Sequence, residues 1–378
     1  MDNFEDIRPY TPEEIPSAIE ELMAEEYFRK ALAYVTPDVN GFLQKMPMVK
    51  NTDQFQQEML FPVIKWLMGI VSDGVQGSGF SYIDNNKGYT YISNHRDILT
   101  DALFLGYLLR TNGLKSPEMA LGDNLLVYPW MRILVRLCKG IIVYRNLPLK
   151  RTLEEASRLS GYINQTISDN NNSVWIAQRE GRTKDSDDRT QESVLKMLSF
   201  AGKEDMRGNV KALNITPVSI SYEYDACDYL KAREFQFKRD NAEFKKTPKD
   251  DLNSMAVGLM SRKGKVNFVI TEPINDKIDA LPESLTKAEF YTAVAKIIDE
   301  AIHQGYVLYP INYAAYDLLK GTEMFVDKYT AEEKEKFSMY VDGQIAKIKD
   351  LPNPDNNFLR EKILEMYSNP LKNKLKLD

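Results

Sequence analysis

The chain has 378 residues, enough for two average domains or for one large domain with helical additions. Its 43% hydrophobic and 28% charged residues are typical of a soluble globular protein that buries a large core. A net charge of −6 excludes a surface that is basic throughout, so nucleic acid is not an expected partner and any anion-binding site must be local.

The cysteines and the first residues indicate a cytoplasmic protein. Cys138 and Cys227 are too few for a disulfide framework or a metal cluster, which favours a reducing compartment. The acidic start "MDNFEDIRPYTPEEIP" has no apolar core and does not fit a signal peptide. Because no apolar run reaches about 18 residues, we expect a protein that contacts a membrane peripherally and does not cross it.

Residues 11–75 are predicted to be helical. Thr11 is a predicted helix cap, followed by a proline in the first turn and by acidic residues that suit the helix dipole. The apolar stretch "FQQEMLFPVIKWLMGIVSDG" is interrupted by Pro62 and is expected to end at Asp73-Gly74. It fits a buried core helix, and it also fits an interfacial helix or the wall of an acyl-chain site.

The pattern changes near residue 79, where strands begin. "GFSYID" and "GYTYISN" alternate as strands do, and "NNKG" between them predicts a hairpin turn. The preceding "GVQGSG" is interpreted as a turn, since it neither follows a strand nor opens a helix. Helices and strands then alternate as far as residue 304. This alternation predicts an α/β fold, with a mixed sheet flanked by helices.

Three regions follow from this pattern. Residues 1–75 are predicted to form an N-terminal helical region, residues 76–310 an α/β domain, and residues 311–378 a C-terminal helical extension. In the extension, Thr330 and Glu333 have the spacing of a capping box.

One of the two histidines, His95, lies between a predicted strand and a predicted helix. The letters "HRD" suggest a protein-kinase catalytic loop, but Ala102 stands where that loop needs an asparagine. Side chains converge on ligands at strand-to-helix junctions of α/β sheets, so a functional His95 is expected, with a structural role as the alternative. The other histidine, His303, is expected to serve a helix dipole or the surface.

A stretch from Asn124 to Leu153 contains no acidic residue. Three of its cations, Arg132, Arg136 and Lys139, are spaced to share one helix face, which suits a phosphate-bearing ligand or an anionic membrane. A solvated face with extended side chains is the alternative. The other cations of the stretch are Arg145, Lys150 and Arg151.

A second basic segment is "REGRTKDSDDR", which follows the predicted strand "SVWIAQ". Gly181 permits a tight turn, and Glu180 would hold one of the arginines. The donors suited to phosphate are Arg179, Arg182, Lys184 and Arg189. An ordinary exposed loop is the alternative.

Four segments occur in the order of four sequence blocks of a known family. They are "SNHRDILTD" (93–101), "GIIVYR" (140–145), "REGRTK" (179–184) and "ITPVSISYE" (215–223). In this order they resemble the glycerol-3-phosphate / 1-acylglycerol-3-phosphate (lysophosphatidate) acyltransferase family. Each block alone is weak, but four in order are specific. The third block departs from the family pattern, because Gln178-Arg179 replaces the expected Phe-x before the glutamate.

The resemblance implies that His95 is a general base that takes a proton from a substrate hydroxyl, which attacks a fatty acyl thioester. A carboxylate would hold the imidazole and stabilise its protonated form. The family's spacing puts that carboxylate at Thr100, so the candidates are Asp101, one residue later, and Asp97. The resemblance also implies these substrate-binding residues: Arg96, Arg145, Arg179, Glu180, Gly181, Arg182 and Pro217.

The resemblance implies a cytoplasmic, peripherally membrane-associated O-acyltransferase of phospholipid biosynthesis. It would acylate glycerol-3-phosphate or lysophosphatidate from acyl-CoA or acyl-carrier protein, without a metal or redox cofactor. One alternative is an acyltransferase for another lipid hydroxyl, such as that of an aminoacyl lipid. Another is a lipid-binding protein that keeps the fold without the chemistry, which the displaced Asp101 would explain.

Overall fold

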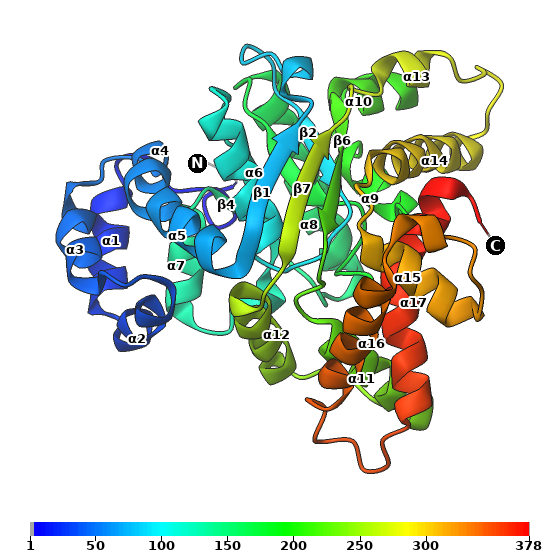
Figure 1. Cartoon of the computed structure of the whole chain (residues 1–378). Helices are drawn as coiled ribbons and strands as arrows, with labels where there is room; N and C mark the ends of the chain where they lie inside the picture. Colours follow the sequence, from blue (N-terminus) through cyan, green and yellow to red (C-terminus); the bar gives the residue numbers. More distant parts are fainter. Residues whose placement is uncertain (1–3, 378) are drawn as a thin grey trace.

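A seven-stranded sheet runs through the middle of the chain, and the computed structural model describes residues 4–377 around it (Figure 1). The strand order is β1-β7-β6-β2-β5-β3-β4. All neighbouring strands are parallel except β6 and β7, which run antiparallel, so the predicted mixed sheet is confirmed. The strands are β1 (Ser72–Ser78), β2 (Thr90–Ser93), β3 (Glu118–Gly122), β4 (Gly140–Val143), β5 (Val174–Ala177), β6 (Ile215–Tyr222) and β7 (Gly264–Ile270).

Helices cover both faces of the sheet and extend it at both ends of the chain (Figure 1). The α-helices are α1 (Ile15–Ala24), α2 (Glu26–Val35), α3 (Val39–Lys45), α4 (Thr52–Gln54), α5 (Phe61–Val71), α6 (Thr100–Thr111), α7 (Pro129–Leu137), α8 (Leu149–Ser168), α9 (Glu192–Leu198), α10 (Met206–Ala212), α11 (Asp228–Asp240), α12 (Pro248–Met260), α13 (Asn275–Asp279), α14 (Lys287–Gly305), α15 (Pro310–Lys320), α16 (Ala331–Ile345) and α17 (Asn356–Leu375). Among the described residues, no helix is both long and apolar enough to cross a membrane.

The sheet is buried on both faces, as expected for parallel strands with helices on each side. On one face, Ile92 and Val174 join a core that includes residues of α8 and α14. On the other face, Tyr91 and Trp175 join a core that includes residues of α5 and α6. Alternate residues of one strand therefore point into different cores.

The predicted hairpin over residues 79–94 is wrong. β2 pairs in parallel with β5 and β6, while β1 lies at the sheet edge and pairs with β7. The glycines that suggested a turn belong to the edge strand and its end. Gly79 has φ +82, and a Cβ there would come 1.9 Å from the carbonyl oxygen of Ile270. Glycine is needed here because the neighbouring backbone approaches closely.

Other differences concern where elements begin. The strand β3 was not predicted, and the first helix begins at Ile15 instead of following a Thr11 cap. The amide of Thr11 instead donates to a Glu14 carboxylate oxygen at 2.7 Å, so the preceding residues form a turn. The apolar stretch before Asp73 ends as α5, whose Phe61, Ile64, Leu67 and Val71 are buried as in a core helix.

The helical ends occupy separate sides of the sheet. α1 and α2 contact α7, and α15, α16 and α17 pack on one another and on α11 (Figure 1). The predicted boundary at 75/76 falls inside β1, and that at 310/311 falls in the first turn of α15. The division into three regions remains a prediction, and its residues 1–3 and 378 lie outside the described part. The capping box of Thr330 and Glu333 is present at the start of α16.

Candidate active site

The loop that carries His95 leaves the sheet at the carboxyl end of β2. Asn94 fixes this exit with two hydrogen bonds to Ile220 of β6. Its Nδ2 donates to the Ile220 carbonyl at 2.9 Å, and its Oδ1 accepts from the Ile220 amide at 2.8 Å. An amide side chain thus takes the place of a backbone group in the β2–β6 ladder, and the next residue turns out of the sheet.

His95 is held by Asp101. The imidazole Nδ1 lies 2.9 Å from Asp101 Oδ2, and the Asp101 side chain is fully buried. The same oxygen accepts from the backbone amides of Arg96 at 2.6 Å and Asp97 at 3.1 Å. α6 begins only at Thr100, so residues 96–99 form a turn and the six-residue offset is not a helical one. Asp101 lies in the first helical turn, where the helix dipole favours a carboxylate.

Asp97, the other predicted partner, has a different role. Its Oδ1 accepts from the amides of Leu99 and Thr100, at 3.0 and 2.8 Å, and from the Thr100 hydroxyl at 2.8 Å. These bonds satisfy amides at the start of α6 that have no helical partner. The structure therefore brings Asp101, and not Asp97, to the imidazole of His95.

Trp175 of β5 packs against the ring of His95. The ring centroids lie 5.6 Å apart in an edge-on arrangement, and the Trp175 Nε1 donates to the Ser93 hydroxyl at 3.0 Å. Because Nδ1 faces the Asp101 carboxylate, it carries the proton of the neutral ring. Nε2 then has the free lone pair, as a general base requires.

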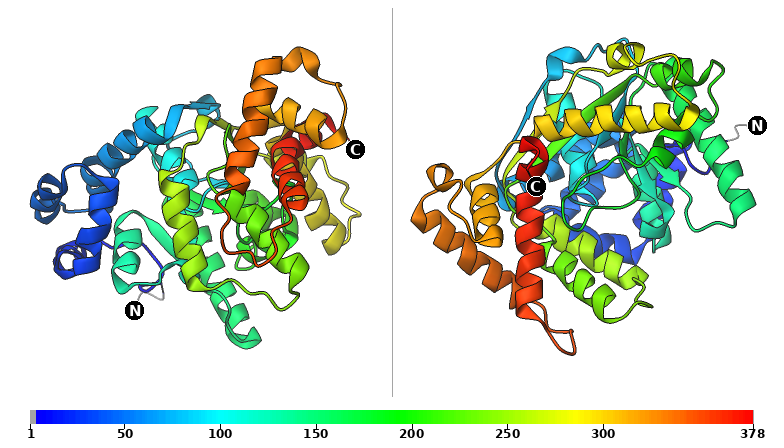
Figure 2. Two further views of the ribbon diagram at one scale, coloured as in Figure 1. Left: turned by 60° about the horizontal axis from the view of Figure 1, so that its bottom comes forward. Right: turned by 90° about the vertical axis from the view of Figure 1, so that its right-hand side faces the viewer.

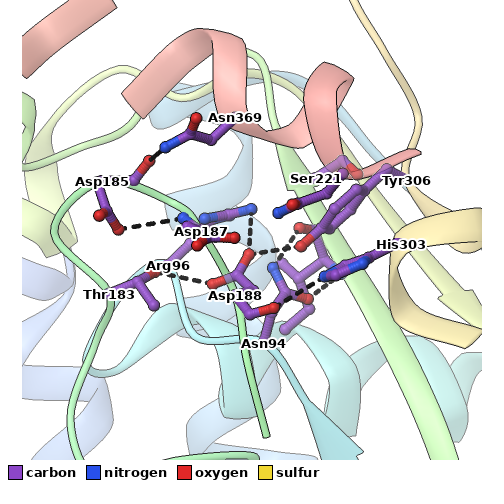
Figure 3. Close-up of polar contacts among 12 residues, drawn as sticks. Asn94, Arg96, Thr183, Asp185, Asp187, Asp188, Ser221, His303, Tyr306 and Asn369 are labelled. Carbon is purple, nitrogen blue, oxygen red and sulfur yellow. Dashed lines mark hydrogen bonds and ion pairs between the residues drawn. The ribbon is translucent and has the colours of Figure 1, made fainter. Parts of the chain in front are cut away.

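Arg96 points away from this base into a buried network, shown in Figure 3. Its Nη2 lies 2.7 Å from Asp188 Oδ2, and its guanidinium lies over the Tyr306 ring. The Tyr306 hydroxyl donates to the same Asp188 oxygen at 2.5 Å, and the Thr183 hydroxyl donates to Asp188 Oδ1 at 2.8 Å. Asp188 thus connects the His95 loop to the loop that contains Gly181.

His303 belongs to the same network. Its Nε2 donates to the backbone carbonyl of Asp188 at 2.8 Å, and the side chain is buried. His303 lies in the last turn of α14, as predicted, but it is buried and bonded inside the molecule, so the expected surface position is wrong.

The loop after β5 turns at Gly181, whose φ of +68 favours glycine. The Glu180 amide donates to Gln191 Oε1 at 2.8 Å, and Arg145 Nη1 lies 3.4 Å from Glu180 Oε1. Arg182 is buried, and its Nη1 has no hydrogen-bond partner among the described residues. The same holds for Nε of Arg179. The structure thus brings Arg145 to Glu180 and leaves unpartnered donors on Arg179 and Arg182, and the predicted phosphate clamp remains a prediction.

Arg182 lines a small pocket that is partly open to solvent. The other charged residues that line it are Lys184, Lys231, Arg233, Glu234, Lys246 and Asp250. α11 and the region up to α12 supply most of them, and sequence reasoning missed these because no motif marks them. Lys184 and Lys246 both pair with Glu234, at 3.0 and 3.2 Å. Among the lining residues, positive side chains outnumber negative ones.

Burial and crowding of positive charge make Lys184 unusual. Burial, together with Arg182 and Lys246, outweighs the attraction of Glu234 and lowers the pKa of Lys184 to about 7. Burial alone would raise the pKa of Glu234, but the lysines Lys184, Lys238 and Lys246 lower it to about 2. A bound anion would compensate the excess positive charge beside Arg182.

Pro217 lies within the sheet. It is buried in β6, opposite Ile92 of β2, and its carbonyl accepts from the amide and hydroxyl of Thr271, both at 3.0 Å. A proline is tolerated at this point because the antiparallel pairing of β6 with β7 begins only at the next residue, Val218.

The predicted basic face of Arg132, Arg136 and Lys139 is wrong as a shared binding surface. Arg136 is buried and donates to the carbonyls of Arg8 and Glu5, at 2.7 and 2.6 Å. Lys139 lies beyond the end of α7, and its Nζ lies 2.6 Å from a carboxylate oxygen of Asp53, which is far away in the sequence. The first residues of the chain occupy this face, and that long-range contact is not visible in the local sequence.

The fold and the site combine a histidine–carboxylate pair at a strand end with a pocket lined by basic residues. Residues 74–221 match the family model described as Acyltransferase, and this interval contains His95, Asp101 and Arg182. This match covers less than half of the chain; it agrees with the family that the sequence resembles and supports an acyltransferase enzyme.

Two solved structures resemble the chain at low identity. The 1-acyl-sn-glycerophosphate (LPA) acyltransferase PlsC of Thermotoga maritima is 13% identical, with a TM-score of 0.43, over 76% of this chain and 95% of that chain. The signal recognition particle 54 kDa protein of Aeropyrum pernix, solved with GDP, is 11% identical, with a TM-score of 0.22, over 90% of this chain and 80% of that chain. A search of curated proteins finds no match.

Proposed function

We propose that the chain transfers a fatty acyl group from acyl-CoA or acyl-carrier protein to a hydroxyl of glycerol-3-phosphate or a lysophosphatidate-like lipid. The observation that carries the proposal is the placement of the His95–Asp101 pair in an acyltransferase domain that also contains the unpartnered Arg182 nitrogen. A base and an anion site are the two elements that such a reaction requires.

In this mechanism, Nε2 of His95 accepts the proton of the acceptor hydroxyl while the hydroxyl oxygen attacks the thioester carbonyl. The tetrahedral intermediate collapses and the carbon–sulfur bond breaks. The thiolate leaves and takes the proton from Nε2, so the products are an ester and a free thiol. Asp101 stays ionised throughout and stabilises the imidazolium. The acceptor hydroxyl has the place that a serine has in a hydrolase triad.

The phosphate of the acceptor would bind to Arg182 and Arg145. Arginine presents planar, forked donors that match phosphate oxygens, and a fixed phosphate positions the hydroxyl for attack. The Arg145–Glu180 contact of 3.4 Å is loose and partly exposed, so Arg145 can exchange it for a phosphate. Glu180 and Gly181 would then orient the loop.

The remaining parts of the proposal concern cofactor and location. The base, the proton and the acyl group all come from His95 and the two substrates, so the scheme requires no cofactor besides the thioester co-substrate. The acceptor and product are amphiphilic, so the enzyme would act at the cytoplasmic surface of a membrane as a peripheral protein. The displaced Asp101, which motivated a non-catalytic alternative, reaches His95 through the turn at residues 96–99.

The test is an assay of the purified protein with labelled acyl-CoA or acyl-carrier protein and competing acceptors, with products identified by mass spectrometry. The acceptors are glycerol-3-phosphate, lysophosphatidate and an aminoacyl lipid. We expect an acylated phosphate-bearing product that His95→Ala abolishes. Transfer to the aminoacyl lipid alone, or equal turnover by His95→Ala, would refute the proposal.

A further inference from the structure

Two leucines stand exposed at the start of α8. Leu149 is 78% exposed and Leu153 56% exposed, and their spacing of four places them on one helix face. Residues 148–154 are all exposed, whereas the later part of α8 packs on the sheet. Figure 2 shows this end of α8 projecting from the body of the molecule. Lys150 and Arg151, between the leucines, are exposed as well.

A second apolar group lies between α2 and α7. Tyr27, 59% exposed, stacks on Tyr128, 39% exposed, with ring centroids 5.6 Å apart. Val127 is exposed beside Tyr128, and Lys30 lies over the Tyr27 ring. Stacked, half-exposed tyrosines next to lysine are typical of the boundary between water and lipid headgroups.

Arg145 connects the two groups. Its amide donates to Asp123 Oδ1 at 3.0 Å, four residues before Val127. Along the chain, Leu149 follows Arg145 by four residues, a span of at most about 14 Å. Each group is therefore tied to Arg145 by a short stretch of chain, and the Arg145 side chain lies 3.4 Å from Glu180, in the loop that contains Arg182.

The charge of the α8 group is locally positive although the chain as a whole is acidic. The sequence has no acid from residue 124 to residue 153, and the first acids after it are Glu154 and Glu155. Glu155 pairs with Arg158 at 2.9 Å. Positive side chains beside exposed leucines match a surface that offers both negative headgroups and an apolar interior.

We propose that a docking surface, made of Leu149, Lys150, Arg151 and Leu153 with Tyr27, Val127 and Tyr128, binds an anionic lipid bilayer. The leucines enter the acyl region, the tyrosines lie at headgroup level, and Arg145 faces acceptors held in the same membrane. A second copy of the chain fits less well, because a symmetric contact would bring Lys150 and Arg151 against their own copies. The inference deepens the proposed function and rests on it for the location of the acceptor.

The test is co-sedimentation of the full chain with vesicles of phosphatidylcholine alone and of phosphatidylcholine with phosphatidylglycerol. We expect stronger binding to the anionic vesicles, weakened by salt. The double variant Leu149→Ser/Leu153→Ser should lower the partition coefficient by about tenfold or more. Lys150→Gln/Arg151→Gln should remove the preference for phosphatidylglycerol. Met339→Ser, at an exposed methionine on α16, is the matched control and should bind as the parent does.

All variants are also assayed with a water-soluble short-chain thioester and glycerol-3-phosphate, where unchanged turnover shows an intact fold. Unchanged vesicle binding by the leucine variant would overturn the inference. So would a dimer that only the leucine variant dissolves, which would make the surface an interface between copies. Vesicle binding without acyl transfer to any acceptor would refute the proposed function alone, and acyl transfer without vesicle binding would refute the docking surface alone.

Discussion

Asp101 reaches His95 across a turn of four residues, and one carboxylate oxygen serves the imidazole and two backbone amides at once. The arrangement fixes the ring orientation without a helical register between the two residues. It explains why the carboxylate can stand one residue later than the family's spacing requires. The extra residue is absorbed before α6 begins, so the pair keeps its contact.

The first prediction separates the two aspartates of the turn. Asp97→Asn keeps an oxygen that can accept from the start of α6, so we expect kcat within tenfold of the parent. The free energy of unfolding should fall by about 1 kcal/mol, since one cap interaction is weakened. Steady-state kinetics and urea unfolding measure the two quantities. A loss of kcat as large as that of Asp101→Asn would show that Asp97 takes part in the chemistry.

The second prediction concerns the Asp188 network. Thr183→Val removes the hydrogen bond between Thr183 and Asp188 within the loop that contains Gly181, and we expect a loss of about 1 kcal/mol of stability with a raised KM for the acceptor. Tyr306→Phe is the matched control. Tyr306 follows α14 directly, and this substitution removes the hydrogen bond from its hydroxyl to the same Asp188 carboxylate. It should lower stability similarly and leave KM unchanged. Equal KM values for both variants would contradict the positioning role of Thr183.

The third prediction follows from the lowered pKa of Lys184, about 7. A bound phosphate raises this pKa, so acceptor binding takes up a proton and the acceptor KM should rise as the pH increases from 6 to 9. In the absence of ligand, the unfolded chain binds this proton between pH 7 and the ordinary lysine pKa near 10.5, so stability rises with pH in that window. Lys184→Met should flatten both dependences. KM against pH and thermal unfolding against pH measure them.

The fourth prediction concerns Asp228, which joins α11 to the C-terminal helices. Burial raises its pKa to about 6, although the hydroxyls of Tyr340 and Tyr367 donate to it at 2.7 and 2.8 Å. Because the folded-state pKa lies above the ordinary value, its stabilising contribution is present below about pH 4 and is lost as the pH rises through 6. Amide hydrogen exchange in α16 and α17 should therefore be slower at pH 5 than at pH 7, after correction for the intrinsic exchange rate. Asp228→Asn should remove the difference, and a difference that persists in this variant would assign it to another group.

The sequence predicts this site well where its signals are local. The apolar strand before Asn94, the polar turn and the helix after Thr100 are contiguous, so the position of His95 at a strand end could be inferred. The turn at Gly181 and its basic neighbours were predictable for the same reason. The sequence also indicated Asp101 and Asp97 as candidate partners of His95, but the choice between them depends on how the four turn residues fold back.

Long-range pairing explains the rest. Residues about 190 positions apart meet in β1 and β7, and glycines that suggest a turn allow that approach. The local sequence suggests that Arg136 is an exposed cation. In the structure it is covered by the N-terminal residues Glu5 and Arg8, whose carbonyls accept its hydrogen bonds. The basic residues of α11 and of the segment after it join the pocket beside Arg182 through tertiary packing alone, so no spacing in the sequence marks them.

The most direct test of the central claim, that His95 and Asp101 act as one base, is a double-mutant cycle on kcat for acyl transfer. We expect His95→Ala to lower kcat by about 10³-fold or more and Asp101→Asn by at least about 10²-fold. Because the two residues act as a unit, the double variant should be no slower than His95→Ala alone. Independent, multiplying effects of the two substitutions, or a kcat for His95→Ala equal to that of the parent, would contradict the account.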